Sequence, residues 1–126
     1  MPVMISGGLR SVEAAHMAFE RTGAEAIMLA RGALGNPWLF EQLLGRRFAE
    51  PSVAEVLVEL DWVIERAREH LGDERAGRYL RKFYPWYVER VGGTRALQAA
   101  VQQAPGPDAV RELIRATRSE PAAAAA

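Results

Sequence analysis

The spacing of hydrophobic positions changes about two fifths of the way along the chain. Two short apolar runs, 2–5 and 26–30, each lead into a glycine-containing turn, which predicts two buried strands. From residue 51 onward, apolar positions recur every three or four residues, as in amphipathic helices. The pattern therefore predicts an α/β segment followed by an all-α segment, with helices predominating.

Helix-capping residues separate these elements. Ser11 is expected to begin a helix that ends at Gly23, and Asn36 is expected to cap a second helix with Pro37 in its first turn. Ser52-x-x-Glu55 is a capping box ahead of the longest helical pattern. Further helix starts are expected at Asp73, Thr94 and Asp108, and stops at Gly72, Pro85, Gly92-Gly93 and Pro105-Gly106-Pro107.

Two strands alone cannot form a parallel sheet with both faces covered. Residues 1–46 are therefore expected to be the C-terminal end of a larger α/β domain, followed by a helical domain over 47–118 and a disordered tail over 119–126. Without its neighbours, the first segment is expected to self-associate through exposed strands or to pair with a missing segment. It should also show weaker hydrogen-exchange protection than the helical half.

The amino-acid composition excludes several classes of protein and of functional site. The 126 residues are 49% hydrophobic and 25% charged, which argues against wholesale disorder. The absence of cysteine excludes disulfide scaffolds, cysteine zinc sites and cysteine nucleophiles within this chain. No apolar run is long enough to span a bilayer, so no membrane partner is expected. With no cysteine and only two histidines, no metal site and a cytoplasmic location are expected.

A net charge of zero hides a segregation of charge along the chain. Residues 75–95 contain five arginines and one lysine against a single acid. Arg75, Arg78 and Lys82 have the spacing of one helical face, Arg81 flanks them, and aromatic residues are interleaved. Cations that neutralise phosphates, beside planes that stack on bases, favour an RNA interface. The alternative is a solvated helix face over a core of aromatic residues.

Two other charged patterns are interpreted as solvated surface. They are an acidic row, Asp61, Glu65 and Glu69, and an arginine stripe, Arg111, Arg115 and Arg118.

The glycine turns after the two strands are candidates for phosphate binding. Loops at the carboxyl ends of parallel strands bind ligands, and glycine lets a phosphate approach the backbone closely. Ser6-Gly7-Gly8 follows the first strand and Arg31-Gly32 the second, where the arginine adds a cation. The alternative is that these glycines only form tight turns.

The chain resembles the tRNA-dihydrouridine synthase family, most specifically in the stretch RGALGNPWLF at residues 31–40. The segment Arg81-Lys82-Phe83-Tyr84 with Trp86-Tyr87 is also similar to the basic-aromatic segment of that family's helical domain. The resemblance implies the end of an FMN-binding TIM barrel followed by a helical tRNA-binding domain. It also implies a whole enzyme that reduces uridine in tRNA, using FMN and NADPH.

The resemblance also implies roles for residues of this chain. Contacts to the FMN phosphate are implied for Ser6, Gly7, Gly8, Ala30, Arg31 and Gly32. Contacts to tRNA are implied for Arg75, Arg78, Arg81 and Lys82. The family's catalytic cysteine belongs to an earlier barrel segment, so this chain is expected to contain no catalytic residue and to be inactive alone. The alternatives are a stand-alone RNA-binding helical module with a vestigial barrel end, and part of another phosphate-binding barrel enzyme.

Overall fold

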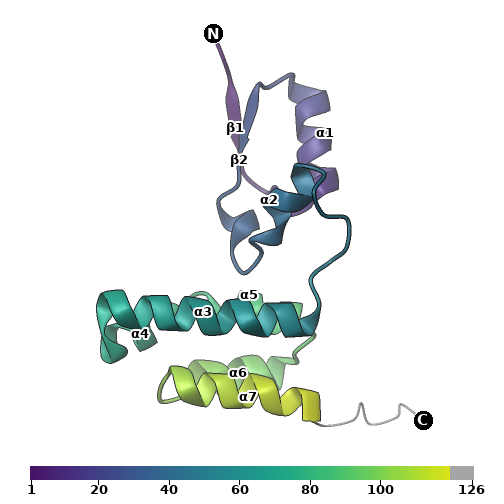
Figure 1. Cartoon of the computed structure of the whole chain (residues 1–126). Coiled ribbons are helices and arrows are strands. Elements are labelled where there is room, and N and C mark those ends of the chain that lie inside the picture. The colour runs from purple at the N-terminus through teal and green to yellow at the C-terminus, as the bar shows by residue number, and fades with distance from the viewer. Residues whose placement is uncertain (120–126) are drawn as a thin grey trace, which may run out of the picture. The chain divides into compact units, whose positions relative to one another are not determined.

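The computed structural model describes residues 1–119, with the backbone alone at 118 and 119, and divides into two compact units (Figure 1). Unit 1 is Met1–Pro51, and unit 2 begins at Ser52. The chain is mostly helical with one small parallel sheet. Of the tail expected at 119–126, residue 119 ends the last helix, and 120–126 lie outside the described residues.

Unit 1 contains a strand–helix–strand arrangement. Strands β1 and β2 pair in parallel, with Ser6 opposite Met28. The Ser11 side chain accepts a hydrogen bond from the Ala14 amide at 3.1 Å, as predicted for a helix N-cap. Its elements are β1 (Met4–Ser6), α1 (Val12–Thr22), β2 (Ala26–Met28), the short 3-10 helix η1 (Arg31–Ala33) and α2 (Trp38–Leu43).

Both predicted strands form, and in this chain they are partly exposed, as expected for apolar strands that lack their neighbours. Met4 is 59% exposed and Met28 is 52% exposed. The described sheet has only two strands. Each strand therefore has one edge without a neighbouring strand, and the sheet alone cannot cover its two faces. The strands are apolar in sequence yet lack the layers that would bury them.

Up to residue 119, unit 2 contains five helices around a shared apolar core. Helix α3 contacts α4, α5 and α7, and α6 contacts both α5 and α7. The largest side chains that are almost fully buried there include Leu60, Ile64, Leu80, Tyr84 and Ile114. The helices are α3 (Val53–Leu71), α4 (Asp73–Leu80), α5 (Tyr84–Arg90), α6 (Arg95–Gln103) and α7 (Pro107–Ser119).

Caps formed by Ser and Thr are confirmed in unit 2. The Ser52 hydroxyl accepts from the Glu55 amide at 3.3 Å, and the Glu55 carboxylate accepts from the Ser52 amide at 2.8 Å. The Thr94 hydroxyl accepts from the Leu97 amide at 3.2 Å. In each case the donor and acceptor are three residues apart, so the interaction follows from local sequence alone.

Predicted caps with Asn and Asp are wrong. Asp73 and Asp108 already lie inside the first turns of α4 and α7, and their carboxylates pair with arginines instead. Asn36 is only 3% exposed and its side chain makes no capping bond to α2. The predicted stop at Pro85 is also wrong, because α4 has already ended at Leu80. Pro85 instead lies in the first turn of α5, where its missing N–H needs no acceptor.

Candidate functional site

The two predicted glycine turns lie together at one end of the sheet of unit 1. Because β1 and β2 are parallel and in register at Ser6 and Met28, both turns leave the same edge. Gly32 packs directly on the segment that follows the first turn. A Cβ at Gly32 would overlap the Leu9 carbonyl oxygen and would lie 2.8 Å from the carbonyl carbon. The chain therefore holds the Ala30–Gly32 turn against Leu9, next to the Ser6–Gly8 turn.

These turns have the backbone and charge that suit an anionic group. Gly7 and Gly8 have φ values of 107° and 65°, which other residues rarely adopt, and a Cβ at either would meet open space. Arg31 is exposed beside them. Backbone amides without covering side chains, together with a nearby guanidinium, are groups that suit a phosphate.

The basic segment, residues 75–82, does not form one helical face. Arg75 and Arg78 lie on α4, but α4 ends at Leu80, so Arg81 and Lys82 lie in the turn before α5. The prediction that Lys82 shares a face with Arg75 and Arg78 is therefore wrong. All four cations are exposed nevertheless. The Lys82 Nζ lies 4.2 Å from the centroid of the Tyr79 ring, a cation–π contact.

The aromatic residues of this region divide between core and surface. Tyr84 and Tyr87 are buried, Trp86 is half-buried and Tyr79 is 46% exposed. Burial raises the pKa of the Tyr84 hydroxyl to about 12 and also raises the pKa of Tyr87. The two buried tyrosines therefore belong to the core, while Tyr79 offers an exposed ring beside the cations.

Parts of the acidic row and of the arginine stripe, which were interpreted as solvated surface, instead form an arginine–carboxylate network. Glu69 remains exposed, and the side chain of Arg118 lies outside the described residues. The Arg111 side chain on α7 is 16% exposed and pairs with Asp61 at 2.9 Å and Glu65 at 2.6 Å, both on α3. Arg115 also pairs with Asp61. Arg68 joins the network through Asp73, Glu65 and Asp108. Sequence reasoning missed this network, although acids and arginines that each repeat at a four-residue spacing are a signal for two facing helices.

We expect this network to make unit 2 less stable as the pH falls. Hydrogen bonds from Arg111 and Arg68 lower the pKa of Glu65 and Asp108, respectively. A carboxylate whose pKa is lower in the folded state stabilises the fold above its ordinary pKa, and this contribution is lost on protonation. Between pH 7 and pH 3 at low salt, the melting temperature should fall less for Asp108→Asn than for the wild type.

The matched control is Glu112→Gln, because Glu112 is an exposed carboxylate on the same helix for which no ion pair is found within residues 1–119. Its pH profile should follow the wild type. A profile for Asp108→Asn that also matches the wild type would contradict a stabilising role for the network.

Unit 2 also has an open apolar groove between α3 and α4, here the Trp62 groove. Its lining includes Trp62, which is 59% exposed, with Val63, Leu71 and Tyr79.

Within residues 1–119, no helix is long and apolar enough to cross a membrane. The same residues contain no group of three or more side chains that could hold a metal ion.

Comparison with known proteins relates these features to one family. The chain matches the family described as Dihydrouridine synthase (Dus) over residues 1–123. It is 34% identical to tRNA-dihydrouridine synthase B of Pasteurella multocida over 72% of this chain and 29% of that protein. The enzyme of the same name from Xanthomonas axonopodis is 31% identical over 91% of this chain and 36% of that protein. The one from Pseudomonas aeruginosa is 30% identical over 86% and 34%.

The chain thus spans about a third of the length of these relatives. Since the family match extends across both units, from the glycine turns to α7, the chain belongs to the dihydrouridine synthase family.

Proposed function

We propose that this chain is the C-terminal portion of a flavin-dependent tRNA-dihydrouridine synthase. The whole enzyme reduces a uridine in tRNA, and this chain contributes contacts to FMN and tRNA without being catalytic alone. The observation that carries the proposal is the close packing of Gly32 on Leu9, which holds two glycine turns at the carboxyl ends of adjacent parallel strands. That is the position at which α/β barrels bind phosphate.

In this proposal, residues 1–46 are the end of an FMN-binding TIM barrel. The exposed faces and edges of β1 and β2 are then the surfaces that neighbouring barrel strands and helices would cover. Ser6, Gly7, Gly8, Ala30 and Gly32 bring their backbone to the phosphate, and Arg31 provides the cation. When bound, FMN supplies the hydride chemistry and NADPH recharges it, while the residues named here anchor the cofactor.

Residues 47–118 are then the helical tRNA-binding domain. The support is the concentration of exposed cations, Arg75, Arg78, Arg81 and Lys82, next to the exposed ring of Tyr79. Contacts of this kind neutralise backbone phosphates and position an RNA, and they carry little sequence information.

A hybrid enzyme tests both roles. The 126-residue chain alone, given FMN, NADPH and unmodified tRNA, should form no dihydrouridine, because it contains no cysteine to act as the general acid that the family resemblance implies. Joined to the upstream two thirds of the Pasteurella multocida relative, it should form dihydrouridine. In this hybrid, Arg31→Ala should weaken FMN retention about 10- to 100-fold, because a hydrogen bond to a charged group contributes about 1.5–3 kcal/mol.

The matched control is Arg46→Ala, another exposed arginine of unit 1 that lies outside the turns. It should retain FMN as the unaltered hybrid does. Dihydrouridine formation by the chain alone would contradict the proposal, as would equal FMN retention by the Arg31 and Arg46 variants. If the chain binds RNA tightly while the hybrid folds but retains no FMN, the result would instead favour a stand-alone RNA-binding module.

A further inference from the structure

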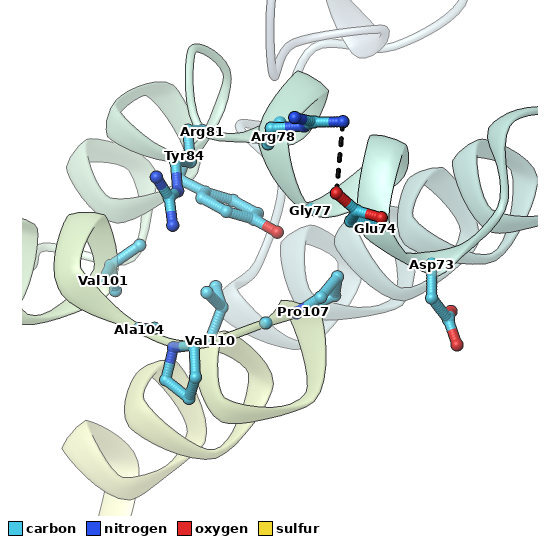
Figure 2. A pocket seen from close by; sticks show the side chains of 12 residues that line it. Asp73, Glu74, Gly77, Arg78, Arg81, Tyr84, Val101, Ala104, Pro107 and Val110 are labelled. Atoms are coloured by element: carbon cyan, nitrogen blue, oxygen red, sulfur yellow. Dashed lines mark ion pairs between the residues drawn. The ribbon is translucent and has the colours of Figure 1, made fainter.

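A cavity of about 220 Å³ lies within unit 2, among α4, α5, α6 and the start of α7 (Figure 2). It is named here the Tyr84 cavity. Small or compact residues line much of it, including Gly77, Ala104, Pro105, Gly106 and Pro107. Whole-ligand sites usually measure about 300–1,000 Å³, so this cavity suits a fragment of a larger molecule.

The hydroxyl of Tyr84 is the unusual polar group of this cavity. Tyr84 is 2% exposed, and its Oη finds no hydrogen-bond partner among the described residues. Figure 2 shows the ring lying among the lining residues, with the hydroxyl directed to the side where Gly77 and Pro107 lie. A tyrosine hydroxyl is protonated at neutral pH, so it can both donate and accept a hydrogen bond. A buried hydroxyl without a partner costs folding free energy, which suggests that a ligand completes it.

The charges around the cavity favour a group that carries one negative charge and hydroxyls. The acids on its rim are already paired, Asp73 with Arg68 at 3.0 Å and Glu74 with Arg78 at 3.4 Å. None of the ion pairs found within residues 1–119 involves Arg81, which also lines the cavity. One guanidinium therefore remains available for an anion, and paired carboxylates can still accept hydrogen bonds from hydroxyls.

We propose that the Tyr84 cavity takes a ribose-phosphate unit of a bound RNA strand. Arg81 pairs with the phosphate, and the Tyr84 hydroxyl hydrogen-bonds to the ribose 2′-hydroxyl. This inference rests on the proposed function of unit 2 in binding tRNA, and it deepens that function by adding a means of distinguishing RNA from DNA. The 2′-hydroxyl is the group that allows such discrimination, since DNA lacks it.

The test compares Tyr84→Phe with Tyr87→Phe in the full 126-residue chain. Tyr87 lies on the same helix and is equally buried, but it does not line the cavity. Binding is measured to unmodified tRNA and to a DNA strand of the same sequence. Tyr84→Phe should weaken tRNA binding about three- to tenfold, leave DNA binding unchanged and leave the melting temperature equal or higher, because the lost hydroxyl had no partner in the protein. Tyr87→Phe should change neither affinity.

A second variant fills the cavity instead of removing its polar group. A Cβ at Gly77 would lie 3.7 Å from the Pro107 Cδ, so Gly77→Ala fits, and it should stabilise α4. Gly77→Leu would occupy much of the remaining space and should weaken tRNA binding about tenfold relative to Gly77→Ala.

Unchanged tRNA affinity in Tyr84→Phe and Gly77→Leu would overturn the cavity proposal, as would an equal loss for RNA and DNA. The proposed function has a separate readout. If Arg75→Gln weakens both tRNA and DNA binding while the cavity variants have no effect, only the cavity proposal fails. If the unaltered chain binds no tRNA, both fail.

Discussion

Replacing Arg75, Arg78 and Lys82 together by glutamate is expected to abolish tRNA binding by this chain. The three side chains are exposed, and the triple substitution changes the local charge by six units. Because phosphate contacts depend on released counterions, the affinity at low salt should fall more than about a hundredfold. The fold should persist: the Arg78–Glu74 ion pair is highly exposed and contributes little to stability. The measurement is tRNA affinity at two salt concentrations, with circular dichroism and thermal melting.

A charge-matched control separates a specific surface from a general charge effect. Arg21, Arg46 and Arg66 are three exposed arginines outside the basic segment, and their joint replacement by glutamate gives the same net charge. This control should keep most of the tRNA affinity. If the two triple variants bind equally well, the basic segment is only a solvated surface and the tRNA assignment fails.

Among substitutions that add one methyl group to unit 1, Gly32→Ala is expected to disturb the structure most. The added Cβ would overlap the backbone of Leu9, which cannot rotate away as a flexible side chain can. Overpacking of a core typically costs about 1–3 kcal/mol, and a clash with the main chain should reach or exceed the upper end of that range. We expect the Ala30–Gly32 turn to separate from Leu9 and hydrogen-exchange protection of β1 and β2 to be lost.

Gly106→Ala is the control for this experiment, because a Cβ there meets nothing within 4 Å and Gly106 has no positive φ. Neither variant should reduce the protection of α3, because Gly32 belongs to the other unit and a Cβ at Gly106 meets open space. Unaltered strand protection in Gly32→Ala would show that the two turns are not held together by this contact.

Much of the fold follows from local sequence. Ser11, Ser52 and Thr94 were predictable caps, because each bonds to an amide three residues away. Asp73 and Asp108 were not, because both carboxylates pair with Arg68 through the tertiary arrangement of α3, α4 and α7. Asp108 also pairs with Arg111 on its own helix. The strand positions were recognisable from apolar runs, but their exposure depends on how many strands the sheet contains.

The candidate site was predictable in part for the same reason. Glycine turns after strands were visible in the sequence, whereas the contact between Gly32 and Leu9 joins residues 23 positions apart and required the fold. The helical spacing of Lys82 with Arg75 was misleading, because α4 ends at Leu80 before the pattern is complete. The unpartnered hydroxyl of Tyr84 had no signal in the sequence, since burial and lack of a partner are properties of packing.

The residues of the arginine–carboxylate network are also expected to covary among related chains. Arg111 and Arg68 share Glu65 and Asp108, and Arg111 and Arg115 share Asp61. Substitution effects within such a network are not additive, because loss of one cation leaves neighbouring carboxylates to repel each other. Lysine would be a poor replacement at Arg111, since a single ammonium cannot present the planar set of donors that reaches three carboxylates. Related chains are therefore expected to change these arginines and acids together, by replacing a cation and its carboxylates as a set.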